Sequence, residues 1–427
     1  MSKSIEISSS SHNGMNVIVC STEKFKTITI SLVLTVPLKA DKCGIRALIP
    51  YVLTSSTKNC PDKSLVNEKL DNLYGADLQI EVNKKGENQL LTFRMQIISD
   101  QYSEENAQLL ASAIMFLHEI VYDPYVNHDG FLLNIVEAEK KALKKKVKSI
   151  VNDQSIYASI RLIEEVFEGS PRGVFALGNI EDIDRATPLS VYEAYMDLLK
   201  ESKVEMFVVG RIKENKLVKV IQSIFVNDYV QNFKTTRSRS YNKSLNNIKT
   251  IHEISNTQQS QLLVGYQTNV TIKDSDFEAC RVANAIFGRF PSSKLFQSIR
   301  EKEAIAYFIL SQLEINNGIL MVIAGINVSD YDRTLKLILK QEEAMKLGEF
   351  TPEEVEKSKV LLKNLLLEAY DTPMGIIDIC MQLMESGKKI DDVNNQIKRI
   401  SEVTKRDIVR VVKNWRLDTV FFLKEGD

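Results

Sequence analysis

Residues 292–307, SSKLFQSIREKEAIAY, lie in the second half of the chain and decide how the rest of the sequence is interpreted. Apolar residues recur at helical spacing from Leu295 to Ile299. Ser292 or Ser293 comes just before them, where a hydroxyl group commonly caps a helix. The stretch therefore predicts a short capped helix in its first part.

The pattern changes after this helix. Residues 304–310 are small, β-branched or aromatic, which predicts a strand, and residues 314–318 form a turn signal before a second strand at 319–326. Arg300 therefore closes the predicted helix, while Tyr307 lies on the strand that follows. We expect these two side chains to reach one cleft from adjoining elements.

This stretch, with Ile286-Phe287-Gly288 upstream, resembles the C-terminal-half signature of the insulinase/pitrilysin metallopeptidase family, which includes the mitochondrial processing peptidases. The resemblance extends over nearly the whole chain. In that family an Arg and a Tyr at the positions of Arg300 and Tyr307 hold the substrate backbone against a zinc centre housed in another half or subunit. The resemblance thus implies that Arg300 and Tyr307 bind substrate.

The zinc motif of the family is missing. Active members carry His-x-x-Glu-His on the first helix of the N-terminal half, which supplies two zinc ligands and a general base. Here the helix beginning at Gly44 has Ala47, Pro50 and Tyr51 at those positions. The third ligand of the family, a Glu on a later helix, is matched by the lysine-rich residues 143–148, whose charge repels a cation. We therefore expect no metal in this chain.

No other zinc site is suggested by the remaining residues. The four histidines lack a second His, Cys or carboxylate at ligand spacing on a shared helix face; they are His12, His118, His128 and His252. Lys140, Lys144 and Lys148 align on one helix face, which is typical of a solvated surface or of a grip for acidic substrate segments.

Length and composition set further limits. At 427 residues the chain exceeds what one core usually serves. A net charge of -1 implies no general attraction to nucleic acid or anionic membrane, and no apolar run approaches the roughly 20 residues that span a bilayer. Residues 1–14 lack signal-peptide and transit-peptide character, and five scattered cysteines without a CxxC motif indicate reduced thiols. We expect a cytoplasmic protein.

The two halves of the chain repeat one another. Residues 180–187, IEDIDRAT, match residues 397–404, IKRISEVT, and the offset is 217 residues, from 397 minus 180. The repeat predicts an N-terminal half at 1–212, a linker at 213–247 and a C-terminal half at 248–427. Each half is expected to be α+β, a mixed and mostly antiparallel sheet with helices on one face. The resemblance implies that the halves form a clamshell.

Two functions are compatible with these observations. In the first, the chain is the non-zinc subunit of a heterodimeric zinc endopeptidase. A paralogous partner with His-x-x-Glu-His would bind zinc, while Arg300 and Tyr307 would hold the peptide in trans, for instance during leader removal from ribosomally made peptides. In the second, it is a catalytically silent scaffold or binding protein, and some members of the most similar group are associated with modification of elongation factor P. Retention of the Arg/Tyr pair favours the first.

Overall fold

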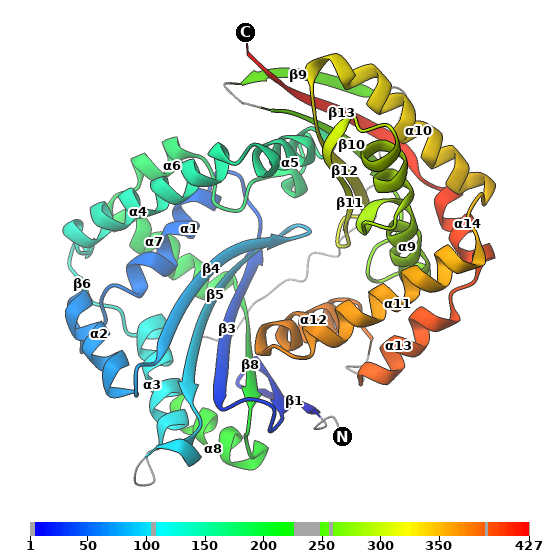
Figure 1. The fold of residues 1–427 in the computed structure, drawn as a ribbon. Coiled ribbons are helices and arrows are strands. Elements are labelled where there is room, and N and C mark those ends of the chain that lie inside the picture. Colours follow the sequence, from blue (N-terminus) through cyan, green and yellow to red (C-terminus); the bar gives the residue numbers. More distant parts are fainter. Residues whose placement is uncertain (1–4, 104–107, 226–247, 256–258, 389–391, 427) are drawn as a thin grey trace. The chain divides into compact units, whose positions relative to one another are not determined.

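The structure is a computed structural model that describes residues 5–103, 108–225, 248–255, 259–388 and 392–426. The chain forms two compact units, and each is assembled from three segments. Unit 1 combines Met1–Ser149, Val174–Arg237 and Asp371–Cys380, and unit 2 combines Ile150–Gly173, Ser238–Tyr370 and Met381–Asp427. Figure 1 shows the course of the chain with its helices and strands labelled.

Each unit contains one large sheet. Across the sheet of unit 1 the strands are β1 (Glu6–His12), β2 (Met15–Ser21), β8 (Lys203–Gly210), β3 (Thr27–Pro37), β5 (Asn88–Ile98) and β4 (Asp77–Lys85). Across the sheet of unit 2 they are β9 (Lys249–Ser255), β13 (Arg416–Glu425), β10 (Ser260–Gln267), β12 (Ile319–Ile326) and β11 (Ala306–Glu314).

The two sheets have the same topology once β1 is set aside. The pairs β2–β8 and β9–β13 are parallel, and every further neighbouring pair along the two matching orders is antiparallel. The predicted hairpins of the two halves are β4–β5 and β11–β12. This correspondence confirms the α+β class and the internal duplication that the sequence predicted.

The helices are divided between the two units. Those lying mainly in unit 1 are α1 (Cys43–Leu53), α2 (Lys63–Asn72), α3 (Leu109–Tyr122), α4 (Leu133–Asn152), α6 (Ile180–Arg185), α7 (Pro188–Glu201) and α8 (Glu214–Ile224), with η1 (Asp100–Tyr102) and the small hairpin β6 (Val126–Asn127) and β7 (Gly130–Phe131). Those of unit 2 are α5 (Gln154–Val166), η2 (Pro171–Gly173), α9 (Phe277–Asn284), η3 (Ala285–Arg289), η4 (Phe296–Lys302), η5 (Val328–Asp330), α10 (Tyr331–Leu347), α11 (Pro352–Ala369), α13 (Val393–Glu402) and α14 (Lys405–Lys413).

The helix α12 (Pro373–Glu385) starts in unit 1 and ends in unit 2. The linker predicted at 213–247 contains α8, and its residues 226–247 lie outside the described residues.

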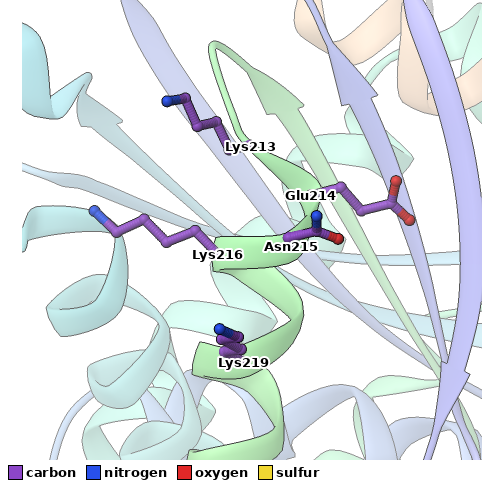
Figure 2. A pocket seen from close by; sticks show the side chains of 5 residues that line it. All are labelled: Lys213, Glu214, Asn215, Lys216 and Lys219. Carbon is purple, nitrogen blue, oxygen red and sulfur yellow. The ribbon is translucent and has the colours of Figure 1, made fainter.

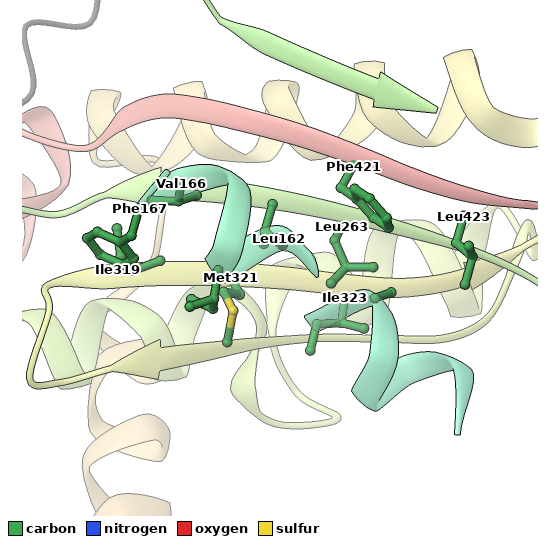
Figure 3. Packing of buried hydrophobic residues seen from close by; sticks show 11 residues of the cluster. Leu162, Val166, Phe167, Leu263, Ile319, Met321, Ile323, Phe421 and Leu423 are labelled. Carbon is green, nitrogen blue, oxygen red and sulfur yellow. The ribbon is translucent and has the colours of Figure 1, made fainter. Parts of the chain in front are cut away.

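Strand β12 shows why the sheet of unit 2 needs helices on both faces, since all its residues are buried. Alternate residues such as Met321 and Ile323 pack against α5, whose Leu162 and Val166 are fully buried. Figure 3 shows these side chains together. On the opposite face, Phe422 of β13 meets the Tyr331 ring of α10 at 4.7 Å between ring centroids. The expected single helical layer therefore has α5 as a counterpart on the second face.

The segment that the repeat matches to α5 lies in unit 1. Adding the offset of 217 to Gln154 gives position 371, where the unit 1 part of the α12 region begins. There Cys380 of α12 approaches Cys20 of β2, with 3.6 Å between the two Sγ atoms. Each unit thus contains a helical segment from the other half of the sequence, an exchange that the simple division into 1–212 and 248–427 does not include.

Candidate functional site

Arg300 lies on η4, which is a π-helical segment and not a regular α-helix. Its guanidinium carbon is 4.8 Å from the centroid of the Phe296 ring, so a cation–π contact restrains the charged end of an exposed side chain. No side chain caps this segment, and the Oγ of buried Ser293 has no hydrogen-bond partner among the described residues, so the cap predicted there is wrong. Short π-helical turns occur frequently at functional sites.

Tyr307 is the extra residue of a β-bulge. Ala306 pairs with Ile326 and Phe308 pairs with Gly325, which leaves Tyr307 without a register partner on β12. Bulges re-aim side chains next to active sites, and the Tyr307 side chain is 58% exposed. Its hydroxyl donates to Asn327 Oδ1 at 3.1 Å.

A short turn joins the two residues. Ala304 has a left-handed backbone with φ 52°, which is uncommon outside glycine and reverses the chain between η4 and β11. The turn is held by the ion pair of Glu303 with Arg333 and by a hydrogen bond from the Ile305 amide to the Ile299 carbonyl at 3.3 Å. The structure therefore places Arg300 and Tyr307 on adjoining elements of unit 2, as the sequence predicted. Both side chains are exposed.

The second π-helical segment, η3, packs behind the strand that carries Tyr307. A Cβ on Gly288 would lie 2.7 Å from Ser311 Cβ and 2.8 Å from Leu295 Cδ1, so only glycine fits. Ser311 Oγ donates to Asn284 Oδ1 at 2.5 Å, inside the protein. Helix α9, η3 and β11 are thus fixed to one another by close packing and a buried hydrogen bond.

The degenerate zinc-motif positions lie together on α1 of unit 1. Ala47 and Pro50 are buried and Tyr51 is partly exposed. Lys146 Nζ of α4 is 5.8 Å from the centroid of the Tyr51 ring, so the lysine-rich segment does lie beside the motif positions, as the resemblance implied. A cation beside two positions without donors does not fit a zinc ion.

The carboxylates near α1 already have hydrogen-bond partners. Glu139 Oε1 accepts from Ser55 Oγ at 2.8 Å and from Lys63 Nζ at 3.4 Å. Glu119 Oε1 accepts from Thr57 Oγ1 at 2.5 Å. Among the described residues, no group of three or more His, Cys, Asp or Glu side chains could hold a metal. The residues around α1 stabilise the fold and have no arrangement for metal chemistry.

The lysine face of α4 divides into structural and exposed members. Lys140 is buried and donates to the carbonyls of Asp184 and Ala186, each at 2.9 Å. Lys144 pairs with the Asp184 carboxylate, and this hydrogen bond holds the pKa of Asp184 below its usual value. Lys148 is exposed. Two of the three aligned lysines thus fasten α6 to α4, which corrects the prediction of a simply solvated or substrate-gripping face.

A shallow depression of about 520 Å³ lies at the start of α8 in unit 1. Figure 2 shows its lining, which consists of Lys213, Glu214, Asn215, Lys216 and Lys219. Lys216 Nζ is 3.6 Å from Asp100 Oδ2. All five lining residues are exposed and come from the start of α8, so the depression is a solvated surface feature.

The contacts of Tyr307 with Asn327 and of Arg300 with Phe296 were not predicted from the sequence. Asn327 lies directly after β12, and the hairpin register, which pairs Ala306 with Ile326, is the signal that could have placed it near Tyr307. Phe296 is four residues before Arg300, and the helical spacing of the apolar residues explains Phe296 by packing alone.

None of the helices in the described ranges has the length and apolar character needed to cross a bilayer.

Comparisons with known proteins give consistent results. Residues 185–362 match the family described as peptidase M16 inactive domain. YmfF of Bacillus subtilis, a probable inactive metalloprotease, is 32% identical over 422 residues, which is 97% of each chain. AlbE of Bacillus subtilis, a biosynthesis protein of the antilisterial bacteriocin subtilosin, is 22% identical over 65% of this chain and 68% of its own.

A solved structure covers almost the whole chain. It is that of a conserved protein from Enterococcus faecalis V583, which is 30% identical to this chain and superposes with a TM-score of 0.90 over 98% of this chain and 99% of its own. The duplicated topology described above is therefore shared with an experimentally determined fold.

Proposed function

The chain belongs to the peptidase M16 family, with inactive members among its relatives, and on this basis we propose that it is the non-zinc subunit of a heterodimeric zinc endopeptidase. The single observation that carries the proposal is an asymmetry between the units. In unit 1 the motif positions Ala47, Pro50 and Tyr51 have no zinc-binding arrangement, whereas in unit 2 Arg300 and Tyr307 are exposed on irregular backbone. Alone, the chain would be a pseudoenzyme.

Each side chain has a definite role in this proposal. A paralogous partner with an intact His-x-x-Glu-His motif would hold the zinc ion through its histidines, and the ion would supply activated water for peptide-bond hydrolysis. Arg300 donates charge-assisted hydrogen bonds to a peptide carbonyl, and Phe296 beneath its guanidinium limits where that group can go. Tyr307 contacts the peptide backbone beside it. This chain therefore positions an extended peptide and leaves bond cleavage to the partner.

A relative and the cysteines of this chain bear on its substrate and on its cellular compartment. The relative AlbE is a protein of subtilosin biosynthesis, and this favours a peptide precursor as the substrate of this chain. All five cysteines are buried free thiols, and Cys20 and Cys380 lie close without a bond between them. Such thiols favour a reducing, cytoplasmic location.

The proposal is tested by substitution in the reconstituted mixed complex. Arg300→Ala and Tyr307→Phe should each lower peptide turnover roughly a hundred-fold or more, since they remove hydrogen bonds to the substrate backbone. Zinc content of the partner and elution of the complex on size-exclusion chromatography should not change. Near-normal turnover by both variants would favour the scaffold function.

Matched control variants are available on the same chain. Arg406→Ala removes an exposed arginine of α14, and Tyr102→Phe removes the hydroxyl of an exposed tyrosine in unit 1. Both should leave turnover within about two-fold, because surface substitutions away from special features usually change free energies by less than about 0.5 kcal/mol. A comparable loss in the controls would mean that the assay reports general damage to the complex.

A further inference from the structure

The hydroxyl of Tyr307 begins a chain of two hydrogen bonds that the proposed function does not use. Tyr307 Oη donates to Asn327 Oδ1 at 3.1 Å, and Asn327 Nδ2 donates to Asp330 Oδ2 at 3.2 Å. The three residues come from β11, from the residue after β12 and from the end of η5. They lie at the end of the hairpin where the bulge is located.

The direction of this chain follows from the chemistry of its last member. An ionised carboxylate only accepts hydrogen bonds, so the Asn327 group that faces Asp330 is the amide nitrogen. The carbonyl oxygen of the Asn327 side chain then faces Tyr307, and it can only accept. Tyr307 is consequently the donor, and its proton is held by Asn327.

The backbone keeps the three side chains in register. The Asp330 amide donates to the Asn327 carbonyl at 3.1 Å, which closes the turn that carries both side chains. Arg333, three residues further along on α10, forms an ion pair with Glu303 just ahead of the Tyr307 strand. The positions of donor and acceptor are therefore fixed by contacts on both sides of the bulge.

We infer that Asn327 and Asp330 are positioning residues that make Tyr307 a hydrogen-bond acceptor toward a backbone N–H of the peptide substrate. With its proton directed at Asn327, Tyr307 Oη offers its lone pairs to the exposed side of the residue. Hydrogen bonds in series polarise one another, which strengthens the oxygen as an acceptor. This inference rests on the proposed function, because it specifies what Tyr307 does in it.

The test is a double-mutant cycle on the reconstituted mixed complex. The probe is a quenched fluorescent peptide chosen from a mixed-sequence pool because the wild-type complex cleaves it. Asn327→Ala should lower kcat/KM about ten-fold, the equivalent of one ordinary hydrogen bond. In the Tyr307→Phe background, the same substitution should have no further effect.

Two companion variants separate positioning from folding. Asp330→Asn retains the size of the side chain but removes the group that dictates the Asn327 orientation, so it should give a smaller loss than Asn327→Ala. Asn316→Ala, at the opposite end of the same hairpin, should leave kcat/KM unchanged. Equal losses from Asn327→Ala with and without Tyr307, or no loss while Tyr307→Phe remains inactive, would overturn the positioning role.

The acceptor role is tested with the substrate. Replacing single backbone amides of the probe by esters removes one N–H donor at a time. At one position the ester should lower turnover by the wild-type complex about as much as Tyr307→Phe does, and it should cause no further loss in Tyr307→Phe. If every ester effect persists in Tyr307→Phe, the acceptor assignment is wrong. If Tyr307→Phe alone cleaves normally, this inference fails. If Arg300→Ala cleaves normally too, the proposed function fails as well, which is an outcome distinct from the preceding ones.

Discussion

At the scale of single residues, Gly288 lies where η3 packs closely on β11 and leaves no room for a side chain. A Cβ there would collide with Ser311 and Leu295, at 2.7 Å and 2.8 Å from their nearest carbon atoms. We expect Gly288→Ala to lower the free energy of unfolding by about 1–3 kcal/mol, the usual cost of overpacking. Urea denaturation monitored by circular dichroism is the measurement.

Gly265 provides the matched control for this prediction. A Cβ on Gly265 would meet Leu162 at 3.4 Å, an ordinary van der Waals distance. Gly265→Ala should therefore change the urea midpoint much less than Gly288→Ala does. Equal effects of the two substitutions would contradict the close packing of η3 on β11.

The sequence predicted the elements that carry Arg300 and Tyr307 better than the local backbone of those elements. It placed Arg300 at the end of a helix and Tyr307 on the next strand. It did not predict the π-helical segment, because a pattern of only two turns is compatible with either i→i+4 or i→i+5 bonding. It also missed the bulge at Tyr307, since one inserted residue leaves the composition of the strand unchanged.

At the scale of elements, α5 is the helix whose placement the sequence left open. The apolar residues of α5 recur at helical spacing, and this pattern alone does not say which sheet they cover. In the structure Leu162 is fully buried against the sheet of unit 2. The physical reason is that β12 and β10 are apolar on both faces and need cover on the second one.

Truncating this contact should measure its contribution. We expect Leu162→Ala to lower the free energy of unfolding by about 2–5 kcal/mol, because it leaves a cavity under α5. Ile156→Ala on the same helix removes a side chain that is 47% exposed and should cost much less. Thermal and urea unfolding of both variants provide the comparison. A similar small loss for both would show that α5 is not anchored through Leu162.

A polar contact of α5 gives this element a dependence on pH. Burial, followed by the hydrogen bond to Glu253, raises the pKa of Tyr157 from 10.0 to about 12. Because the folded state binds this proton more tightly, the stabilisation is complete below pH 10.0 and is lost as the pH rises through about 12. Tyr157→Phe should flatten the decrease in the urea midpoint over this interval, whereas Tyr102→Phe should not. An unchanged alkaline decrease in Tyr157→Phe would contradict the assignment.

At the scale of the whole molecule, the duplication was predictable because repeated motifs carry the repeated topology. The offset of 217 between IEDIDRAT and IKRISEVT was enough to match α6 and α7 with α13 and α14. The exchange of segments between the units was not predictable, since the same amphipathic helix could cover either sheet. Membership of the peptidase M16 family then explains why both halves share one topology.

The predicted absence of zinc binding is a property of the whole chain. Ala47 and Pro50 offer no ligand atoms, and Lys146 places a positive charge near Tyr51. We predict that the desalted chain retains well under one zinc ion per molecule by elemental analysis. One tightly held zinc per chain would contradict this prediction, whatever the activity of the complex.

The most direct test of the central claim is a mixing experiment with the zinc-bearing paralogue. Each chain is purified separately, and cleavage of a quenched fluorescent peptide is measured for each chain alone and for their equimolar mixture. We predict that neither chain cleaves appreciably alone, and that the mixture cleaves with one zinc ion per heterodimer. Cleavage by this chain alone, or by the partner alone at the rate of the mixture, would contradict the claim that this chain positions substrate in trans.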